Sequence, residues 1–260
     1  MKTTKTKWFT SVSLTQLSLV ATGLFLAATS SALATVRYVN VNNANPTPPF
    51  TTWATAATDI QDAVDAAGVG DEILVTNGVY AGGSWVDPYG DSDCVVVDQP
   101  LRLQSVNGPD FTVIDGGGAT TCVYLTNNAV LVGFTLTNGF TYGNGRGVYC
   151  ESNAVLTNCV LSGNSAPYGY GGGAYGGTLN NCILSGDSAS YGGGAYGGTL
   201  NNCILTGNSA TVGGGAFAST LTNCVLSENS GWNGGGAYGG TLNNCTLTGN
   251  SATRPSTSVI

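Results

Sequence analysis

The 260-residue sequence contains no histidine, and only 8% of its residues carry a charge. Histidine is the commonest general base and the commonest transition-metal ligand, so its absence removes the usual residue for general-base catalysis and for transition-metal binding. The only lysines are Lys2, Lys5 and Lys7; beyond them, four arginines stand against 14 acidic residues, a formal charge of −10. We therefore expect no nucleic-acid partner, because phosphate binding needs clustered Lys or Arg, whereas neutral glycans and bound cations are compatible with such a surface.

The sequence also lacks a long hydrophobic run. Leu17 to Ala28 is a largely apolar stretch of twelve residues, too short for a comfortable membrane span. It follows the three lysines and precedes Ala32-Leu33-Ala34, which is typical of a signal-peptide cleavage site. We predict a signal peptide over residues 1–34, no membrane span after its removal, and a secreted or cell-surface protein.

The back half of the chain repeats one unit at a fixed interval. The motif Gly-Gly-Gly-Ala, followed by Tyr or Phe, begins every 21 residues, at Gly171, Gly192, Gly213 and Gly234. A period near twenty residues means that each unit buries its apolar face only by stacking on its neighbours. The strands between Gly and Asn turns are short and evenly spaced. The sequence therefore predicts an all-β solenoid with 21-residue coils.

Equivalent positions of the repeats predict which columns of side chains face inward. Alternate residues of a strand face opposite sides, so each repeated cysteine and the second residue after it should point into the core. The inward cysteines are Cys159, Cys182, Cys203, Cys224 and Cys245, and the leucines are Leu161, Leu184, Leu205, Leu226 and Leu247. A second inward column is Leu179, Leu200, Leu221 and Leu242, flanked by solvent-facing Thr178, Thr199, Thr220 and Thr241.

The cysteine column should be a stack of buried thiols. Side chains one coil apart point the same way, which suits the torsion of a disulfide poorly. Cys94, Cys122 and Cys150 fall outside this register, and a disulfide among them stays open. Two columns of Asn are explained by turn chemistry and by stacked amides along the axis. They are Asn158, Asn181, Asn202, Asn223, Asn244 and Asn164, Asp187, Asn208, Asn229, Asn250.

Ahead of the repeats, the chain divides into less regular parts. Residues 35–80 should hold a strand, a helix over Asp59 to Ala67 with Thr58 as its cap and Gln61 completing a capping box, and a first coil. We expect irregular coils over residues 81–146, the regular repeats over residues 147–252, and a tail without a capping helix over residues 253–260. An open solenoid end exposes strand edges, so we expect that end-to-end association can occur there.

These features resemble the right-handed parallel β-helix proteins of the pectin-lyase-like superfamily. The helix followed by Gly70 to Val75 and Gly78-Val79-Tyr80 is similar to that family's N-terminal cap and first coil. The Gly-Gly-Ala-aromatic units with Leu-x-x-Asn, as from Leu161 to Asn164, resemble the repeats of polymorphic outer-membrane and adhesin-like surface proteins. The resemblance covers Thr35 to Ala252 and implies the fold more than any one activity.

The resemblance also implies an enzyme hypothesis, a polysaccharide lyase with carboxylate-held Ca²⁺ and a basic residue, or a hydrolase with paired carboxylates. From Gly171 to Ala252 the only charged residues are Asp187 and Glu228. The front half has more, because Asp87, Asp91, Asp93 and Asp98 surround a Pro-Tyr-Gly loop, with Arg102 expected to face outward and Arg146 in a Gly-rich loop. Asp91 and Asp93 could share a hard cation such as Ca²⁺. The interpretation that we favour is a solvated acidic loop, with no catalytic, cofactor or metal residue assigned.

An aromatic column is the stronger lead for binding: Tyr149, Tyr175, Tyr196, Phe217 and Tyr238 recur at one position. On the outer face they would suit sugar rings. We favour an inward stack, or rings that seal the Gly-rich corner, with the neighbouring alanines facing out, since large aromatics usually belong to cores. The Thr column could bind ice, although threonine is ordinary in strands. We predict an exported, non-catalytic β-helix acting in adhesion or in contact with neutral polysaccharide or cell-surface glycan; the alternative is a polysaccharide-cleaving enzyme.

Overall fold

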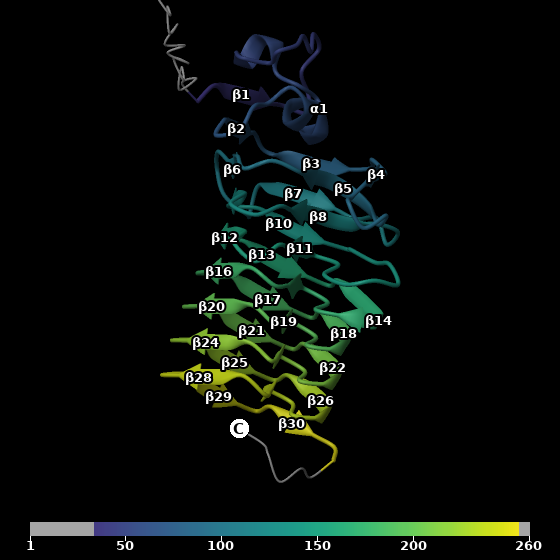
Figure 1. The fold of residues 1–260 in the computed structure, drawn as a ribbon, viewed down its shortest axis with the longest axis vertical. Helices are drawn as coiled ribbons and strands as arrows, with labels where there is room; N and C mark the ends of the chain where they lie inside the picture. The colour runs from purple at the N-terminus through teal and green to yellow at the C-terminus, as the bar shows by residue number, and fades with distance from the viewer. Residues whose placement is uncertain (1–33, 255–260) are drawn as a thin grey trace, which may run out of the picture. The chain divides into compact units, whose positions relative to one another are not determined.

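The structure is a computed structural model that describes residues 34–254, so the expected signal peptide lies outside the described residues except for Ala34. The described chain is a right-handed parallel β-helix, a solenoid of short strands with a single α-helix at its N-terminal end (Figure 1). Every strand pair is parallel except β4 with β5. In the regular coils the chain passes through the first, second, fourth and third sheets in turn. The predicted fold class is confirmed.

Four sheets run along the solenoid. The first contains β1 (Val36–Val39), β2 (Glu72–Val75), β6 (Arg102–Ser105), β9 (Val130–Val132), β12 (Val155–Thr157), β16 (Thr178–Asn180), β20 (Thr199–Asn201), β24 (Thr220–Thr222) and β28 (Thr241–Asn243). The second contains β3 (Gly78–Ala81), β7 (Thr112–Asp115), β10 (Thr135–Thr137), β13 (Val160–Ser162), β17 (Ile183–Ser185), β21 (Ile204–Thr206), β25 (Val225–Ser227) and β29 (Thr246–Thr248).

The other two sheets complete each coil. The third contains β4 (Trp85–Val86), β5 (Ser92–Val97), β8 (Thr121–Leu125), β11 (Val148–Cys150), β15 (Ala174–Tyr175), β19 (Ala195–Tyr196), β23 (Ala216–Phe217) and β27 (Ala237–Tyr238). The fourth contains β14 (Ser165–Tyr170), β18 (Ser188–Tyr191), β22 (Ser209–Val212), β26 (Ser230–Asn233) and β30 (Ser251–Ala252).

The coils shorten along the chain. In the first sheet, the residues paired in register are successively Glu72, Arg102, Val130, Val155, Thr178 and Thr199. These steps are 30, 28, 25, 23 and finally 21 residues. The predicted 21-residue coil therefore holds only from Thr178 onward. In the coil before it, the two additional residues lie within β14, where the register with β18 shifts between Ala166 and Tyr170.

The core is the interior of the solenoid, and its columns are those that the repeats predicted. Leu179, Leu200 and Leu221 are almost fully buried, and the same is true of Cys182 and Cys203. Leu247 and Cys245 are more exposed than their counterparts because the last described coil has a neighbour on one side only. All eight cysteines are free, so no disulfide joins the three that lie outside the register. End-to-end association through the last coil stays a prediction.

Both Asn columns act as the structural devices that were expected. In the outer one, Asn158, Asn181, Asn202, Asn223 and Asn244 adopt the left-handed backbone, with φ between 52° and 55°. In the inner one, Asn164, Asp187, Asn208 and Asn229 are fully buried and Asn250 is half-buried, and hydrogen bonds link the column from coil to coil. Asn208 Nδ2, for instance, donates to Asn229 Oδ1 at 2.9 Å and to the Leu184 carbonyl at 2.9 Å.

The N-terminal helix differs from its prediction in its cap and its length. Helix α1 spans Ile60–Asp65, after a short 3-10 helix at Trp53–Thr55. The cap is Asp59, not Thr58, and its carboxylate accepts a hydrogen bond from the Gln61 N–H at 2.8 Å. The Gln61 side chain points into the core end, where its amide exchanges two hydrogen bonds with the backbone of Val96. The Gln61 side chain is therefore bonded to β5 and does not complete the predicted capping box.

Candidate functional site

The repeated aromatic column lies on the outside of the solenoid, so the inward stack that we favoured is wrong. In each regular coil the alanine of the Ala-aromatic pair is buried, with Ala174, Ala195 and Ala216 each 1% exposed, and the aromatic that follows is half-buried. In the preceding coils Val148 and Val123 occupy the position in register with Ala174 and are fully buried, so small apolar side chains line the interior along the third sheet and the larger rings face out.

The rings form one continuous stack along the third sheet. Neighbouring ring centroids are 4.9 to 5.7 Å apart and their planes differ by 6° to 14° across Tyr149, Tyr175, Tyr196, Phe217 and Tyr238. Each inner ring therefore covers the faces of its two neighbours. What the column offers to a ligand is a wall of ring edges and phenol hydroxyls rather than a set of open ring faces.

A step in the corner between the third and first sheets creates a groove beside this wall. Four residues, 151–154, join β11 to β12, whereas only Gly176 and Gly177 join β15 to β16. Two adjoining hollows, of 370 and 330 Å³, lie at the step. We call them together the step groove; they share Cys150, Ser152 and Tyr175. Its other lining residues are Tyr89, Asn127, Tyr149, Glu151, Gly176, Gly177, Thr178, Tyr196, Gly197 and Thr199.

The glycine corner of the groove is required by its backbone. Gly177 has φ of +68°, and a Cβ at this position would lie 2.7 Å from Cys150 Cβ. A residue with a side chain would be strained there and would collide with the coil below. Gly177 itself is buried, and the glycine backbone that faces the groove between the aromatic wall and Thr178 is that of half-buried Gly176 and exposed Gly197.

One carboxylate, that of Glu151, lines the groove. Its Oε1 accepts a hydrogen bond from the Tyr124 hydroxyl at 2.7 Å. Its Oε2 accepts from the Asn127 backbone N–H at 3.1 Å and from the Asn127 side-chain amide. The half-buried side chain is thus held in one orientation at the end of the groove where Tyr89 stands, and Tyr89 itself packs on Tyr149 with centroids 5.2 Å apart.

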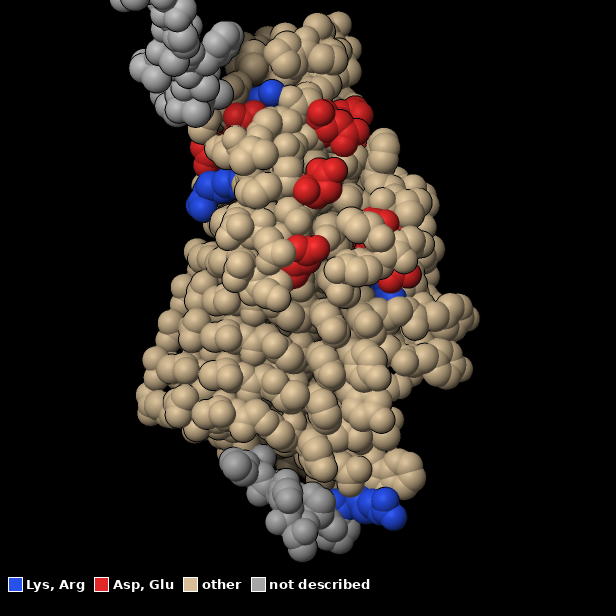
Figure 2. Space-filling view, in the orientation of Figure 1, with Lys and Arg blue, Asp and Glu red and all other residues tan. Residues whose placement is uncertain are grey.

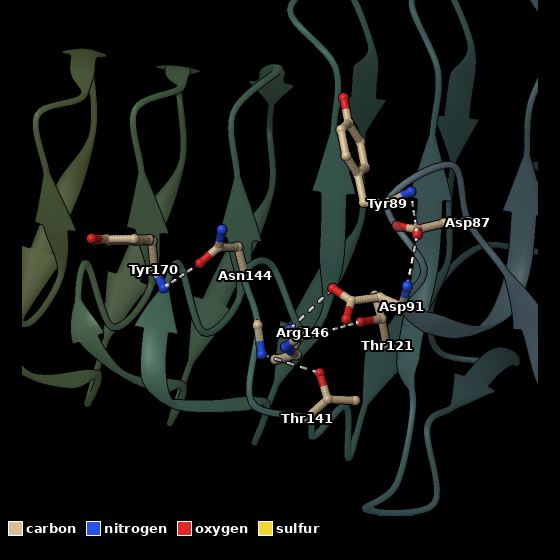
Figure 3. Close-up of polar contacts among 9 residues, drawn as sticks. Asp87, Tyr89, Asp91, Thr121, Thr141, Asn144, Arg146 and Tyr170 are labelled. Carbon is tan, nitrogen blue, oxygen red and sulfur yellow. Dashed lines mark hydrogen bonds and ion pairs between the residues drawn. The ribbon is translucent and has the colours of Figure 1, made fainter.

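The acidic loop is more buried than expected. Asp87 is 6% and Asp93 is 1% exposed, so the interpretation as a solvated loop is wrong for these two residues, and Arg146 is fully buried beside them. Arg146 Nη1 donates to Thr121 Oγ1 at 2.6 Å, and its Nη2 lies 3.4 Å from Asp91 Oδ2 (Figure 3). Asp87 caps the turn, where its Oδ1 accepts from the N–H groups of Tyr89 and Asp91 at 2.8 and 2.9 Å. This network holds Tyr89 at the end of the groove.

The remaining charged residues of the front half lie apart from this network. Asp98 is exposed, and Arg102 is exposed as predicted and pairs with Glu72 at 3.3 Å. Burial, with Asp87 and Asp91 nearby, raises the pKa of Asp93 to about 8, so this side chain keeps its proton at neutral pH. Burial also lowers the pKa of Arg146. Within residues 34–254, no group of three or more Cys, Asp or Glu side chains is placed to hold a metal ion.

The Asp91 side chain of this network is 42% exposed, whereas Asp93 and Arg146 are buried. Both oxygens of Asp93 are buried without a hydrogen-bond partner, and the Arg146 side chain lies beneath Gly143, where an added Cβ would strike the guanidinium. The arrangement holds the β4–β5 loop against the third sheet. The groove beside it, by contrast, is open to solvent.

Sequence reasoning found the aromatic column but missed Glu151 and Tyr89 as its neighbours. A sequence signal was present for Glu151, because Cys150-Glu151-Ser152-Asn153 stands where three of the later coils have Gly-Gly and one has Ala218-Ser219. Tyr89 lies some 60 residues earlier and reaches Tyr149 only through the folded β4–β5 loop, which no repeat pattern predicts.

No protein-family model matches the chain, and no curated protein matches it in sequence. Among solved structures it is similar to a rhamnogalacturonan lyase, with 12% identity, a TM-score of 0.49, and coverage of 87% of this chain and 65% of that one. It is also similar to a pectin methylesterase in complex with a hexasaccharide, with 13% identity, a TM-score of 0.47, and coverage of 86% and 68%. The chain thus spans less than two thirds of the length of the lyase, and these likenesses concern the β-helix architecture alone.

Proposed function

We propose that this protein is a non-catalytic β-helix that acts outside the cell by contacting carbohydrate through the step groove. The observation that carries the proposal is the composition of the groove: ring edges and phenol hydroxyls on one side, bare glycine backbone at the corner, and Ser, Thr and Asn side chains around them. Polar groups of fixed position beside apolar ring surface are the usual features of a site for a small polar ligand.

The chemistry of a sugar fits each of these parts. Sugar hydroxyls can bond with the phenols, with Ser152, Thr178 and Thr199, and with the corner backbone, while sugar C–H groups pack on ring edges. The wall repeats at every coil, so a chain of sugars can meet the same groups more than once. This repetition favours a polymer, or a densely glycosylated surface, over a single small molecule.

Location outside the cell rests on the expected signal peptide and agrees with the chemistry of the thiols. Free cysteines are unusual in exported proteins because disulfides form in oxidising compartments. Here seven of the eight are buried, so the thiols are screened from oxidants. No helix of the described residues is long and apolar enough to cross a membrane.

The test is retention on insoluble neutral polysaccharides, with a variant that fills the groove. Ser152 is exposed at the groove, and Ser152→Trp places a large ring in its mouth. Thr246 is exposed on the second sheet, so Thr246→Trp is a matched control. We expect the wild type and Thr246→Trp to be retained and Ser152→Trp to elute early. Equal retention of all three proteins, or no retention of any of them together with no binding of soluble oligosaccharides, would overturn the proposal.

The enzyme alternative makes a different prediction for the same protein. Incubation with pectin-type polymers and Ca²⁺ would release unsaturated products or reducing ends if the front half were catalytic. The variants Asp91→Asn and Asp93→Asn would then lose this turnover. We expect no products from the wild type, and turnover that depends on either aspartate would refute the non-catalytic proposal.

A further inference from the structure

The step groove carries a negative charge and no compensating positive one. Glu151 is the only charged residue among those that line it. The four arginines of the described chain are all engaged elsewhere: Arg37 with Asp71, Arg102 with Glu72, Arg146 with Asp91, and Arg254 over the Trp232 ring. Figure 2 shows one face of the molecule, on which the charged side chains gather over the N-terminal coils and the regular coils carry almost none.

The Glu151 carboxylate has room for one more donor. A carboxylate offers about four lone-pair positions. On Oε2, Asn127 supplies two donors, and the Thr126 hydroxyl lies 3.4 Å away. On Oε1, the Tyr124 hydroxyl is the one described donor. The second position of Oε1 is therefore available on a side chain that lines an open hollow, and the other bonds fix its direction in advance.

A fixed carboxylate beside ring edges and hydroxyls matches a sugar that bears a positive charge. An ammonium group donates short, charge-assisted hydrogen bonds to a carboxylate, and the phenol hydroxyls nearby can accept hydrogen bonds from its remaining N–H groups. A uronic acid unit would instead bring its own carboxylate next to Glu151, with no Lys or Arg among the lining residues to receive it. The same groove thus distinguishes sugars by their charge.

We infer that the step groove selects glycans that carry free amino groups, of the 2-amino-2-deoxyhexose class, by placing one sugar ammonium on Glu151 Oε1. This rests on the proposed function, because it names the class of sugar taken by the same groove. Tyr89 and Tyr149 bound the position of the amine, and the sugar units that follow lie along the glycine corner toward Thr199.

The experiment compares three soluble oligosaccharides of equal length by titration calorimetry in mildly acidic buffer: glucosamine oligomers with free amines, the same oligomers N-acetylated, and galacturonate oligomers. The proteins are the wild type, Glu151→Gln and Glu228→Gln. Glu228 is exposed and far from the groove lining, so its variant removes the same net charge without touching the site. This control separates the groove from general attraction to an acidic protein.

We expect the wild type and Glu228→Gln to bind the free-amine oligomer about tenfold more tightly than the acetylated one, and the galacturonate most weakly. Glu151→Gln should lose that preference and keep its affinity for the acetylated oligomer. Added salt should weaken the amine complex more than the acetylated one. If Glu151→Gln does not fold, Ser152→Lys, which adds a cation on the exposed neighbour, should reject the free-amine oligomer alone.

The outcomes separate this inference from the proposal on which it rests. Equal binding of amine and acetylated oligomers by the wild type, or a preference that survives both groove variants, would overturn the amino-sugar inference and leave carbohydrate contact standing. Absence of binding to any of the three, together with no retention on insoluble polysaccharide, would overturn the proposed function itself.

Discussion

Asp187 is the one aspartate in the inner column, whose four remaining members are asparagines. We expect the substitution Asp187→Asn to stabilise the protein at neutral pH. Its Oδ1 accepts hydrogen bonds from the Asn164 N–H and side-chain amide at 2.8 and 2.9 Å. Its Oδ2 is buried and has no partner. In the coils that follow, the amide Nδ2 at this position donates to the carbonyl of a leucine, as Asn208 does to Leu184. The carboxyl can make the equivalent bond only when it is protonated.

The magnitude follows from the pKa. Burial raises the pKa of Asp187 from 3.8 to about 8. The unfolded chain releases this proton near the ordinary pKa, whereas the folded protein keeps it until about pH 8. The free energy of unfolding therefore falls as pH rises from about 4 to about 8, by at most ~1.4 kcal/mol per pH unit, and is constant above. At pH 7 the difference from an Asn reaches about 4 kcal/mol as an upper limit, and at pH 4 it shrinks to about 1 kcal/mol or less.

Urea denaturation of both proteins at several pH values between these limits measures the effect. We expect Asp187→Asn to unfold at higher urea than the wild type at pH 7, by about 2 to 4 kcal/mol, with the two curves converging toward pH 4. The pKa of Asp93 is also raised by burial, so its titration should leave some pH dependence of the unfolding free energy in the variant. The reciprocal variant Asn208→Asp should be destabilised most at high pH. A pH-independent difference between wild type and Asp187→Asn would refute the argument.

Three further predictions concern the wall, the corner and the thiols. Phe217→Ala removes two ring stacks and should lower the free energy of unfolding by about 2 to 3 kcal/mol, whereas Phe217→Tyr should be neutral, as thermal denaturation can measure. Gly177→Ala should lower the free energy of unfolding more than Gly207→Ala in the same assay. Both glycines have φ near +65°, but only at Gly177 would an added Cβ also collide with neighbouring atoms. Equal losses of stability would mean that backbone strain alone sets the cost. Cys245, half-buried in the last described coil, should react with iodoacetamide before the buried Cys203, as mass spectrometry of a labelling time course can follow.

The architecture could be predicted from the sequence because the same residue types recur at equivalent positions of successive repeats. A leucine at position 179 recurs at 200 and 221, and all three pair in register. Stacking identical units leaves little freedom for another fold. The direction of the aromatic column was predicted wrongly for a local reason. A two-residue strand contains one inward and one outward side chain, and the rule that large aromatics are buried chose the wrong one.

The candidate site could be predicted only in part, because its residues come from places where the repeat is broken. Arg146 and Asp91 are 55 residues apart and meet through the β4–β5 loop, so their pairing depends on a tertiary contact without a periodic signal. Glu151 is recognisable only as a departure from the Gly-Gly corner. The predicted helix cap was wrong for a similar reason, because the Gln61 side chain forms hydrogen bonds with the backbone of Val96 rather than with the backbone of its own first turn.

Hydrogen–deuterium exchange with and without a bound glucosamine oligomer can locate the contact directly. The bound sugar should slow exchange at the backbone amides of residues 150–153 and 176–178, which form the two sides of the step, and leave the second sheet at 183–185 and 204–206 unchanged. That pattern would place the carbohydrate on the step groove. Protection confined to another sheet, or no protection at a concentration that saturates binding, would contradict the assignment of the groove.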